Sequence, residues 1–266
     1  MRLLGGLHYL VLGGEASWDS LDTALERHGP FLRRWCAEQE VQTNEVQRSW
    51  ALLPAFLSLD DGRPLDLLEL GPSAGLNLLW DRYAYRYSSG TWGSGELELR
   101  GDDRVPPPAE LLSRHVEVVR RRGVDLNPID VTNAEGARVL QAFVWPDQAA
   151  RLERLQRAIE VARLDPPELI RGDYVGKLPE LLRDRVDGAQ LVVFQTASTM
   201  YLERGGAESM RAALHDAGVR EPLVFVTTGR APADDGFALE VERFPGSGPK
   251  RVAVFDFHGA WLDWGR

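Results

Sequence analysis

An acidic residue followed by two glycines gives this sequence its clearest chemical signal. Glu69 stands near the end of a short, largely apolar run, Leu65 to Leu70, and Gly71 and Gly75 follow it. Such a run is typical of a buried strand, and the glycines indicate a tight turn after it. Residues without bulky side chains let a ligand approach the backbone, and the Glu69 carboxylate can face a positively charged group. A turn that needs glycine only for packing is the alternative explanation.

The spacing of the small residues separates several nucleotide-binding motifs. Aligned on Gly71, a dinucleotide fingerprint would require glycine where Ser73 and Leu76 stand, and a P-loop would require a lysine that is missing here. The pattern E-x-G-x-(G/S)-x-G instead resembles the first motif of class I S-adenosylmethionine-dependent methyltransferases. Asn77 is near enough to this turn to touch a ligand. The residues that the resemblance assigns to the methionine half of the cofactor are Glu69, Gly71, Ser73 and Gly75.

Further polar residues stand where later strands are expected to end, and open α/β sheets bind ligands at the carboxyl ends of their strands. Asp125 follows the predicted second strand and is expected to accept hydrogen bonds from ribose hydroxyls. Asp173, in a Gly-Asp pair after the third strand, is expected to meet the adenine edge, although a simple turn explains it equally well. Gln195 and Thr196 follow the apolar run Ala189 to Phe194 and are expected to face the transferred methyl group, with Gln195 in a catalytic role.

Two other groups are candidates for catalysis or for binding the substrate. His258, just beyond the last predicted strand, could act as a general base, and a structural imidazole among aromatic residues is the alternative. Asn44, Glu45 and Arg48 gather on one face of a predicted helix that Thr43 or Asn44 would cap. This cluster either roofs a cofactor pocket and holds a polar substrate, or it is a helix cap with one surface ion pair.

The elements that must position these residues are those of an α/β protein. The apolar runs predict a class I methyltransferase-like, Rossmann-like sheet of seven mostly parallel strands, closed by a C-terminal antiparallel hairpin. A helical segment is expected over residues 1–62, and the α/β domain over 63–266 with an inserted arm at about 84–113. The following alternating tyrosines predict either an aromatic wall for a substrate or a half-buried strand: Tyr83, Tyr85 and Tyr87.

Composition restricts the class of protein further. Of the 266 residues, 44% are apolar and 27% are charged, as in ordinary soluble globular proteins. The net charge of -9 argues against nucleic-acid binding, which needs surplus Lys and Arg. Because Cys36 is the single cysteine, an intramolecular disulfide and a Cys-based metal cluster are excluded, and no metal is expected. No apolar run approaches the ~20 residues that span a bilayer, so we expect a cytoplasmic protein without membrane contact.

Several segments together resemble an uncharacterised bacterial family, domain of unknown function 2332, over nearly the entire chain. The segments are TNEVQRSWALLP, ELGPSAGLNLLWDRYAY, RRGVDLNPIDV, FVWPDQAARLERL, RGDY and FHGAWLDW. Members of that family resemble class I methyltransferases preceded by helices, with more helical sequence ahead of the position of Met1, so a truncated or short member is expected. The implied function is methyl transfer from S-adenosylmethionine to a small molecule. A non-catalytic ligand-binding or protein-interaction module on the same fold is the alternative, and an NAD-dependent enzyme is a further one.

Overall fold

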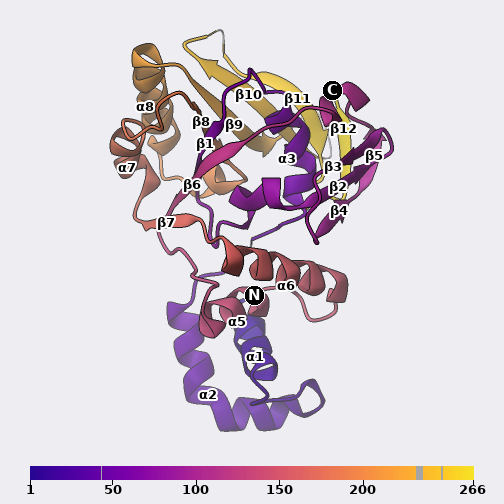
Figure 1. Ribbon diagram of the computed structural model, residues 1–266. Coiled ribbons are helices and arrows are strands. Elements are labelled where there is room, and N and C mark those ends of the chain that lie inside the picture. Colours follow the sequence, from indigo (N-terminus) through magenta and orange to yellow (C-terminus); the bar gives the residue numbers. More distant parts are fainter. Residues whose placement is uncertain (43, 232–235, 247) are drawn as a thin grey trace. The chain divides into compact units, whose positions relative to one another are not determined.

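The computed structural model describes residues 1–42, 44–231, 236–246 and 248–266 (Figure 1). The chain divides into two compact units. The first combines Met1–Asn44 with Ile129–Pro166, and the second combines Glu45–Pro128 with Pro167–Arg266. Neither unit coincides with the helical segment expected over residues 1–62. The reason is that a helix from within this range packs in the second unit, while two later helices pack in the first.

The first unit is helical in its described part. Its elements are α1 (Arg2–Leu12), η1 (Trp18–Ser20), α2 (Leu21–Glu38), α5 (Ala134–Ala142) and α6 (Ala149–Leu164). Leu7 and Leu10 of α1 pack against Ala24 and Leu32 of α2 because the apolar residues of both helices recur at helical spacing. His8 is buried, its Nδ1 lies 3.0 Å from the Val144 carbonyl, and burial lowers its pKa. This histidine therefore has a structural role.

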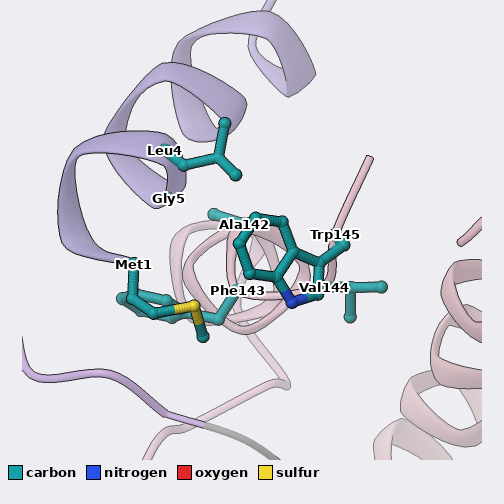
Figure 2. A pocket seen from close by; sticks show the side chains of 7 residues that line it. All are labelled: Met1, Leu4, Gly5, Ala142, Phe143, Val144 and Trp145. Carbon is teal, nitrogen blue, oxygen red and sulfur yellow. The ribbon is translucent and has the colours of Figure 1, made fainter. Parts of the chain in front are cut away.

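A small hollow in the first unit lies between the start of α1 and the end of α5 (Figure 2). Its lining is almost entirely apolar, so it offers no side chains suited to catalysis. The lining residues are Met1, Leu4, Gly5, Ala142, Phe143, Val144 and Trp145.

The second unit contains a nine-stranded sheet within the described residues, in the order β5-β12-β11-β10-β9-β8-β1-β6-β7. Its strands are β1 (Leu65–Leu70), β5 (Asp102–Val105), β6 (Val118–Asp125), β7 (Glu168–Arg171), β8 (Gln190–Gln195), β9 (Leu223–Arg230), β10 (Phe237–Phe244), β11 (Lys250–Phe255) and β12 (Trp261–Trp264). The five strands from β7 to β9 are parallel, and β9 through β12 pair antiparallel. The two faces of β1 and β8 are buried throughout, as expected for central parallel strands.

The prediction of a seven-stranded sheet with a final hairpin is wrong in two respects. The antiparallel part has three consecutive strands, β10, β11 and β12, and β5 from the inserted arm pairs parallel with β12. The rest of the arm forms a separate three-stranded sheet of β2 (Ala84–Tyr87), β3 (Gly90–Trp92) and β4 (Glu98–Arg100). An edge strand needs a partner for its free backbone groups, and β5 finds one about 160 residues away in the chain. Local sequence gives no sign of such a pairing.

Helices cover both faces of this sheet (Figure 1). On one face, α7 (Tyr174–Leu181) and α8 (Gly206–Arg220) pack on Leu68, Val193 and Phe225. The opposite face carries α3 (Arg48–Leu57), all of whose residues are buried, and η2 (Leu76–Arg82). Side chains alternate along a strand, so Glu69 of β1 points to the same face as Phe194 of β8, whose ring meets Phe56 of α3 edge-on.

The segments around the glycine turn and before β1 contain two short helices. The segment after the glycine turn forms the 3-10 helix η2, seven residues long and interrupted at Leu79, where φ is -96° and ψ is 17°. Consequently no long α-helix directs its N-terminus at this turn. The helix expected to begin at Thr43 or Asn44 begins at Arg48 with Gln47 as its N-cap. Residue 43 lies outside the described residues.

Candidate functional site

The strand order reverses direction next to β1. From β1 the chain adds β6 and then β7 on one side, whereas β8 and β9 lie on the other side. The chain therefore crosses from β1 to β6 in one direction along the sheet and from β8 to β9 in the opposite direction. Open α/β proteins bind ligands at such a point, beyond the carboxyl ends of their strands. We call residues 69–77 the Glu69 corner; they run from the last two residues of β1 through the glycine turn into η2.

Glu69 is the most unusual residue of the Glu69 corner. Its side chain is 0% exposed, and neither carboxyl oxygen has a hydrogen-bond partner among the described residues. Burial raises its pKa from 4.5 to about 8, the nearby Asp125 adds to this increase, and the Arg48 guanidinium opposes it. At neutral pH the carboxyl group is therefore mostly protonated. A positive charge placed beside it would favour the ionised form.

Two further polar groups of the Glu69 corner have unused hydrogen-bonding capacity. Asn77 is fully buried; its Oδ1 accepts a 2.8 Å hydrogen bond from Ser49 Oγ, and its Nδ2 has no partner among the described residues. Ser73 is 5% exposed, and its hydroxyl likewise has no partner in the part of the chain that the structure describes. Buried polar groups without partners are costly in free energy. Together with Glu69, these groups require partners that ordered water or a ligand can supply.

The two glycines of the corner are explained by protein contacts. Gly71 has a φ of +73°, and a Cβ there would lie 2.5 Å from the Cβ of Ser198. Gly75 also has a φ of +73°, and a Cβ there would lie 2.8 Å from Pro167 Cγ. Both positions thus require glycine for backbone conformation and packing. The packing alternative accounts for them, and they give no support to the idea that glycine is needed for access of a cofactor.

Asp125 lies where the sequence predicts, at the end of β6 and beside the Glu69 corner. Its Oδ2 accepts a 2.9 Å hydrogen bond from the Ser73 amide, and its Oδ1 accepts one of 2.9 Å from the Asn127 amide. Each carboxylate oxygen has a second acceptor position, so the carboxylate can still receive hydroxyl groups of a ligand. Its role toward a ribose stays a prediction.

Asp173 has a local structural role that sequence analysis left open. It is the N-cap of α7, and its two carboxylate oxygens accept hydrogen bonds from the amides of Val175 (3.0 Å) and Gly176 (3.1 Å). The Gly172 amide donates to the Asp125 carbonyl at 2.8 Å, so Asp173 follows a residue tied to the end of β6. The turn explanation accounts for this aspartate without an adenine contact.

We expect Asp173→Ala to lower the free energy of unfolding by about 1 kcal/mol, because it removes both cap hydrogen bonds at the start of α7. Asp173→Asn, which can still cap the helix, should cost only a few tenths of a kcal/mol. Urea denaturation followed by circular dichroism measures both changes. Equal stability of the alanine variant and the parent would contradict the cap assignment.

Gln195 is committed to internal hydrogen bonds. Its Nε2 donates to Thr227 Oγ1 (2.6 Å) and to the Thr228 carbonyl (2.7 Å), and its Oε1 accepts from the amide (2.9 Å) and hydroxyl (3.4 Å) of Ser198. Both amide hydrogens are thus donated within the protein. The single Ser198 hydroxyl hydrogen is directed to the Leu70 carbonyl at 2.7 Å, so the Ser198 amide is the main donor to Oε1. The catalytic role predicted for Gln195 therefore lacks support in the geometry; the side chain holds the start of η3 (Ser198–Tyr201). Thr196 is 7% exposed, and its carbonyl accepts a 3.4 Å bond from Arg48 Nη1.

The predicted polar cluster of Asn44, Glu45 and Arg48 spans the point in the chain where the first unit gives way to the second. Asn44 belongs to the first unit, whereas Glu45 and Arg48 belong to the second. Arg48 is 5% exposed; its Nε donates to the Phe257 carbonyl at 2.8 Å, and its guanidinium lies 4.2 Å from the centre of the Phe257 ring. Nδ1 of the neighbouring His258 lies 3.6 Å from Glu45 Oε2. The sequence predicted a cluster that contains Glu45 and Arg48 and named His258 apart from it, and the fold brings the three residues together.

The alternating tyrosines are structural. All three are buried, burial raises the pKa of each, and each hydroxyl donates to a backbone carbonyl. The bonds run from Tyr83 to Leu76 (2.7 Å), from Tyr85 to Trp80 (2.6 Å) and from Tyr87 to Trp50 (2.5 Å). The prediction of a substrate wall is therefore wrong, because the rings face the interior.

Two serines that hold side chains and backbone of the site, Ser49 and Ser198, were not predicted from the sequence. Ser49 holds the Asn77 side chain, and Ser198 Oγ donates to the Leu70 carbonyl at the end of β1, at 2.7 Å. Neither serine lies in a recognisable motif. Ser198 does belong to the run of small polar residues after β8, and this position at a strand end is the only local signal of its role.

Together, the fold and the Glu69 corner define an α/β protein with a doubly wound parallel core and a group of buried polar side chains at its switch point. The sequence profile of the family described as "Uncharacterized protein conserved in bacteria (DUF2332)" matches residues 1–264. The chain belongs to this family. No curated protein and no solved structure matches it. Among the described residues, no helix is long and apolar enough to cross a membrane, and no three His, Cys, Asp or Glu side chains are grouped to hold a metal ion.

Proposed function

We propose that this protein is an S-adenosylmethionine-dependent methyltransferase that acts on a small molecule. The observation that carries the proposal is Glu69, a fully buried carboxyl group without hydrogen-bond partners among the described residues, at the switch point of a parallel sheet. Such a carboxyl is unfavourable by itself. It becomes favourable once a positive charge lies next to it, and S-adenosylmethionine carries positive charges on its sulfur and on its amino group.

The residues of the corner fit such a ligand. Glu69 would face the positively charged methionine half, and Ser73 and Asn77 would offer it a hydroxyl and an amide N–H. Asp125 would receive the ribose hydroxyls at the end of the adjacent strand. When bound, S-adenosylmethionine supplies a methyl group activated by the positive sulfur. The protein's part is then to hold donor and acceptor in line, and such positioning accounts for much of the rate enhancement in enzymes.

Isothermal titration calorimetry tests the proposal through the proton on Glu69. With a pKa of about 8, this group is mostly protonated at pH 7, and a neighbouring cation favours its ionised form. We expect S-adenosylmethionine binding at pH 7 to release about one proton, seen as a dependence of the binding heat on the ionisation enthalpy of the buffer. At about pH 9.5 the proton release should be lost.

S-adenosylhomocysteine, which lacks the charge on sulfur but keeps the amino group, identifies the partner of Glu69. Proton release with both ligands would place the amino group beside Glu69, whereas release with S-adenosylmethionine alone would place the sulfur there. NAD serves as the third ligand. Absence of heat with both methionine-derived ligands, on folded protein, would rule out the methyltransferase, and binding of NAD alone would favour a nicotinamide enzyme.

A non-catalytic ligand-binding module is the second candidate. The observation that favours it is Gln195, since both of its amide hydrogens are donated within the protein, to Thr227 and Thr228, and its Oε1 accepts from the Ser198 amide. Ligand binding without transfer of a labelled methyl group to any acceptor would support this reading. The proposal further places the enzyme in the cytoplasm, because the single cysteine, Cys36, is free and suits a reducing compartment.

A further inference from the structure

Glu45 and His258 form a pair of titratable side chains outside the Glu69 corner. His258 Nδ1 lies 3.6 Å from Glu45 Oε2; the histidine side chain is 51% exposed and the glutamate side chain 2% exposed. A buried carboxylate thus stands behind one nitrogen of a half-exposed imidazole. This is the arrangement in which a carboxylate fixes the tautomer of a histidine and leaves the other nitrogen as a proton acceptor.

The pair lies at the same edge of the sheet as the Glu69 corner. β11 runs antiparallel to β10, and β10 runs antiparallel to β9, so β11 has the direction of the parallel strands and ends at their carboxyl edge. His258 follows β11 by three residues. Arg48 ties this turn to the end of β8, because it donates to the carbonyls of both Phe257 and Thr196.

Two further charged residues, Asp256 and Arg48, contact the turn that carries His258. Besides Glu45, the Asp256 carboxylate accepts the backbone amides of His258 (2.7 Å) and Ala260 (3.3 Å). The Arg48 guanidinium lies over the Phe257 ring, and this ring meets the His258 ring edge-on with centroids 4.9 Å apart. The Asp256 carboxylate is therefore engaged by the backbone. Glu45 Oε1 accepts the Gln47 amide at 3.2 Å, and Glu45 Oε2 faces the imidazole.

Resting on the function proposed above, we propose that His258 is the general base of the methyl transfer, positioned by Glu45, and that the acceptor carries a hydroxyl group. Nε2 of His258 takes the hydroxyl proton while the oxygen forms a bond to the methyl carbon. The carbon–sulfur bond breaks, and its electron pair stays on sulfur, which becomes a neutral thioether. The protonated imidazole then returns the proton to water. A hydroxyl needs such a base because it is poorly ionised at neutral pH.

The distance of 3.6 Å between His258 Nδ1 and Glu45 Oε2 is an ion-pair distance, longer than a hydrogen bond. Catalytic hydrogen bonds are commonly long before ligands bind and shorten in the reacting complex. The proposed role requires that neutral His258 carry its proton on Nδ1, and this tautomer can be observed without turnover.

Long-range 1H–15N correlation spectra of 15N-histidine-labelled protein test the pair directly. We expect neutral His258 to carry its proton on Nδ1 in the parent and to lose this preference in Glu45→Ala and Glu45→Gln, both checked for folding by their amide spectra. His215 is the matched internal control, because it lies 3.6 Å from Asp216 but both side chains are exposed, at 65% and 74%. A His258 proton on Nε2 in the parent, or the same tautomer in parent and variants, overturns the proposal.

Transfer of a labelled methyl group to phenol, benzyl alcohol and thiophenol tests the base. Thiophenol ionises readily and needs no base, so we expect His258→Ala to reduce transfer to phenol at least ~100-fold and transfer to thiophenol far less. Transfer to thiophenol alone, transfer to none of the three, or a parental rate with phenol in His258→Ala contradicts the assignment. Calorimetry with S-adenosylmethionine on the same samples separates the two proposals, because a parent that binds no ligand refutes the methyltransferase while the tautomer still decides the pair.

Discussion

Glu69→Gln is expected to stabilise the protein at pH 8, an unusual result for the replacement of a fully buried residue. In the folded state the Glu69 carboxyl keeps its proton up to about pH 8, whereas a carboxyl with the ordinary pKa of 4.5 is ionised in the unfolded chain. Between these two values the folded state binds more protons, so the free energy of unfolding falls as pH rises. At about 1.4 kcal/mol per pH unit, the loss is at most roughly 5 kcal/mol by pH 8.

Glutamine has nearly the same shape and no proton to lose, so Glu69→Gln should remove this pH dependence. Urea denaturation of parent and variant at pH 5, 6.5 and 8 measures it: the two should agree most closely at pH 5 and differ by several kcal/mol at pH 8. Glu160→Gln is the control, because it removes the same charge from an exposed position of α6. A variant less stable than the parent at pH 8 would show that Glu69 is ionised and held by partners.

The same substitution should weaken S-adenosylmethionine binding by at least tenfold, about 1.4 kcal/mol, because a neutral amide cannot balance the ligand's positive charge. A gain in stability together with a loss of binding is the signature of a residue kept for function. If Glu69→Gln gains stability and keeps full affinity, Glu69 is not the cation partner, and the proposed function loses its main support.

Asp66→Ala is expected to cost about 3 to 5 kcal/mol of unfolding free energy, the largest destabilisation that we predict. Asp66 is the second residue of β1 and is 1% exposed. It accepts two hydrogen bonds from Arg120, at 2.9 and 2.7 Å, and one from the Val186 amide at 3.2 Å, and it lies 3.6 Å from Arg122. Its removal leaves Arg122, also 1% exposed and with a pKa lowered by burial, with the exposed Asp184 as its remaining carboxylate partner.

The matched control for this prediction is Asp184→Ala. Asp184 binds the same two arginines but is 61% exposed, so water can replace it, and we expect a cost of about 1 kcal/mol. Midpoints and slopes of urea unfolding curves measure both variants. Because this network lies at the amino end of β1, folded Asp66→Ala should keep the parental affinity for S-adenosylmethionine. A cost below that of Asp184→Ala would contradict the importance assigned to the buried carboxylate.

Local sequence predicts many of the strands well. The bounds of β1 (Leu65–Leu70) agree with prediction, and β8 (Gln190–Gln195) is displaced by one residue from the predicted run Ala189 to Phe194. These strands are short apolar runs between turn residues, and such runs have few alternatives to a buried strand. Glu69 and Asp125 were likewise predicted to lie at strand ends, and the structure places their carboxyl groups close enough to influence one another.

The roles of individual side chains were much less predictable. Sequence cannot show that Thr227 and Thr228, more than thirty residues later, accept both amide hydrogens of Gln195. Gly71 illustrates the same difficulty, since the residue that prevents a side chain there is Ser198, more than a hundred residues later. Hydrogen bonds and close contacts between distant segments leave no periodic signal in the chain.

The sequence by itself determined the α/β class of the fold, the parallel strands around β1 and the acidic residue near the end of that strand. The reason is that apolar runs and turn residues act over a few neighbouring positions. Only the tertiary structure decided the division into two units, the addition of β5 to the edge of the sheet, and the pairing of Glu45 with His258. These features depend on contacts between segments far apart in the chain. Such contacts exist only once burial of the core has brought the segments together.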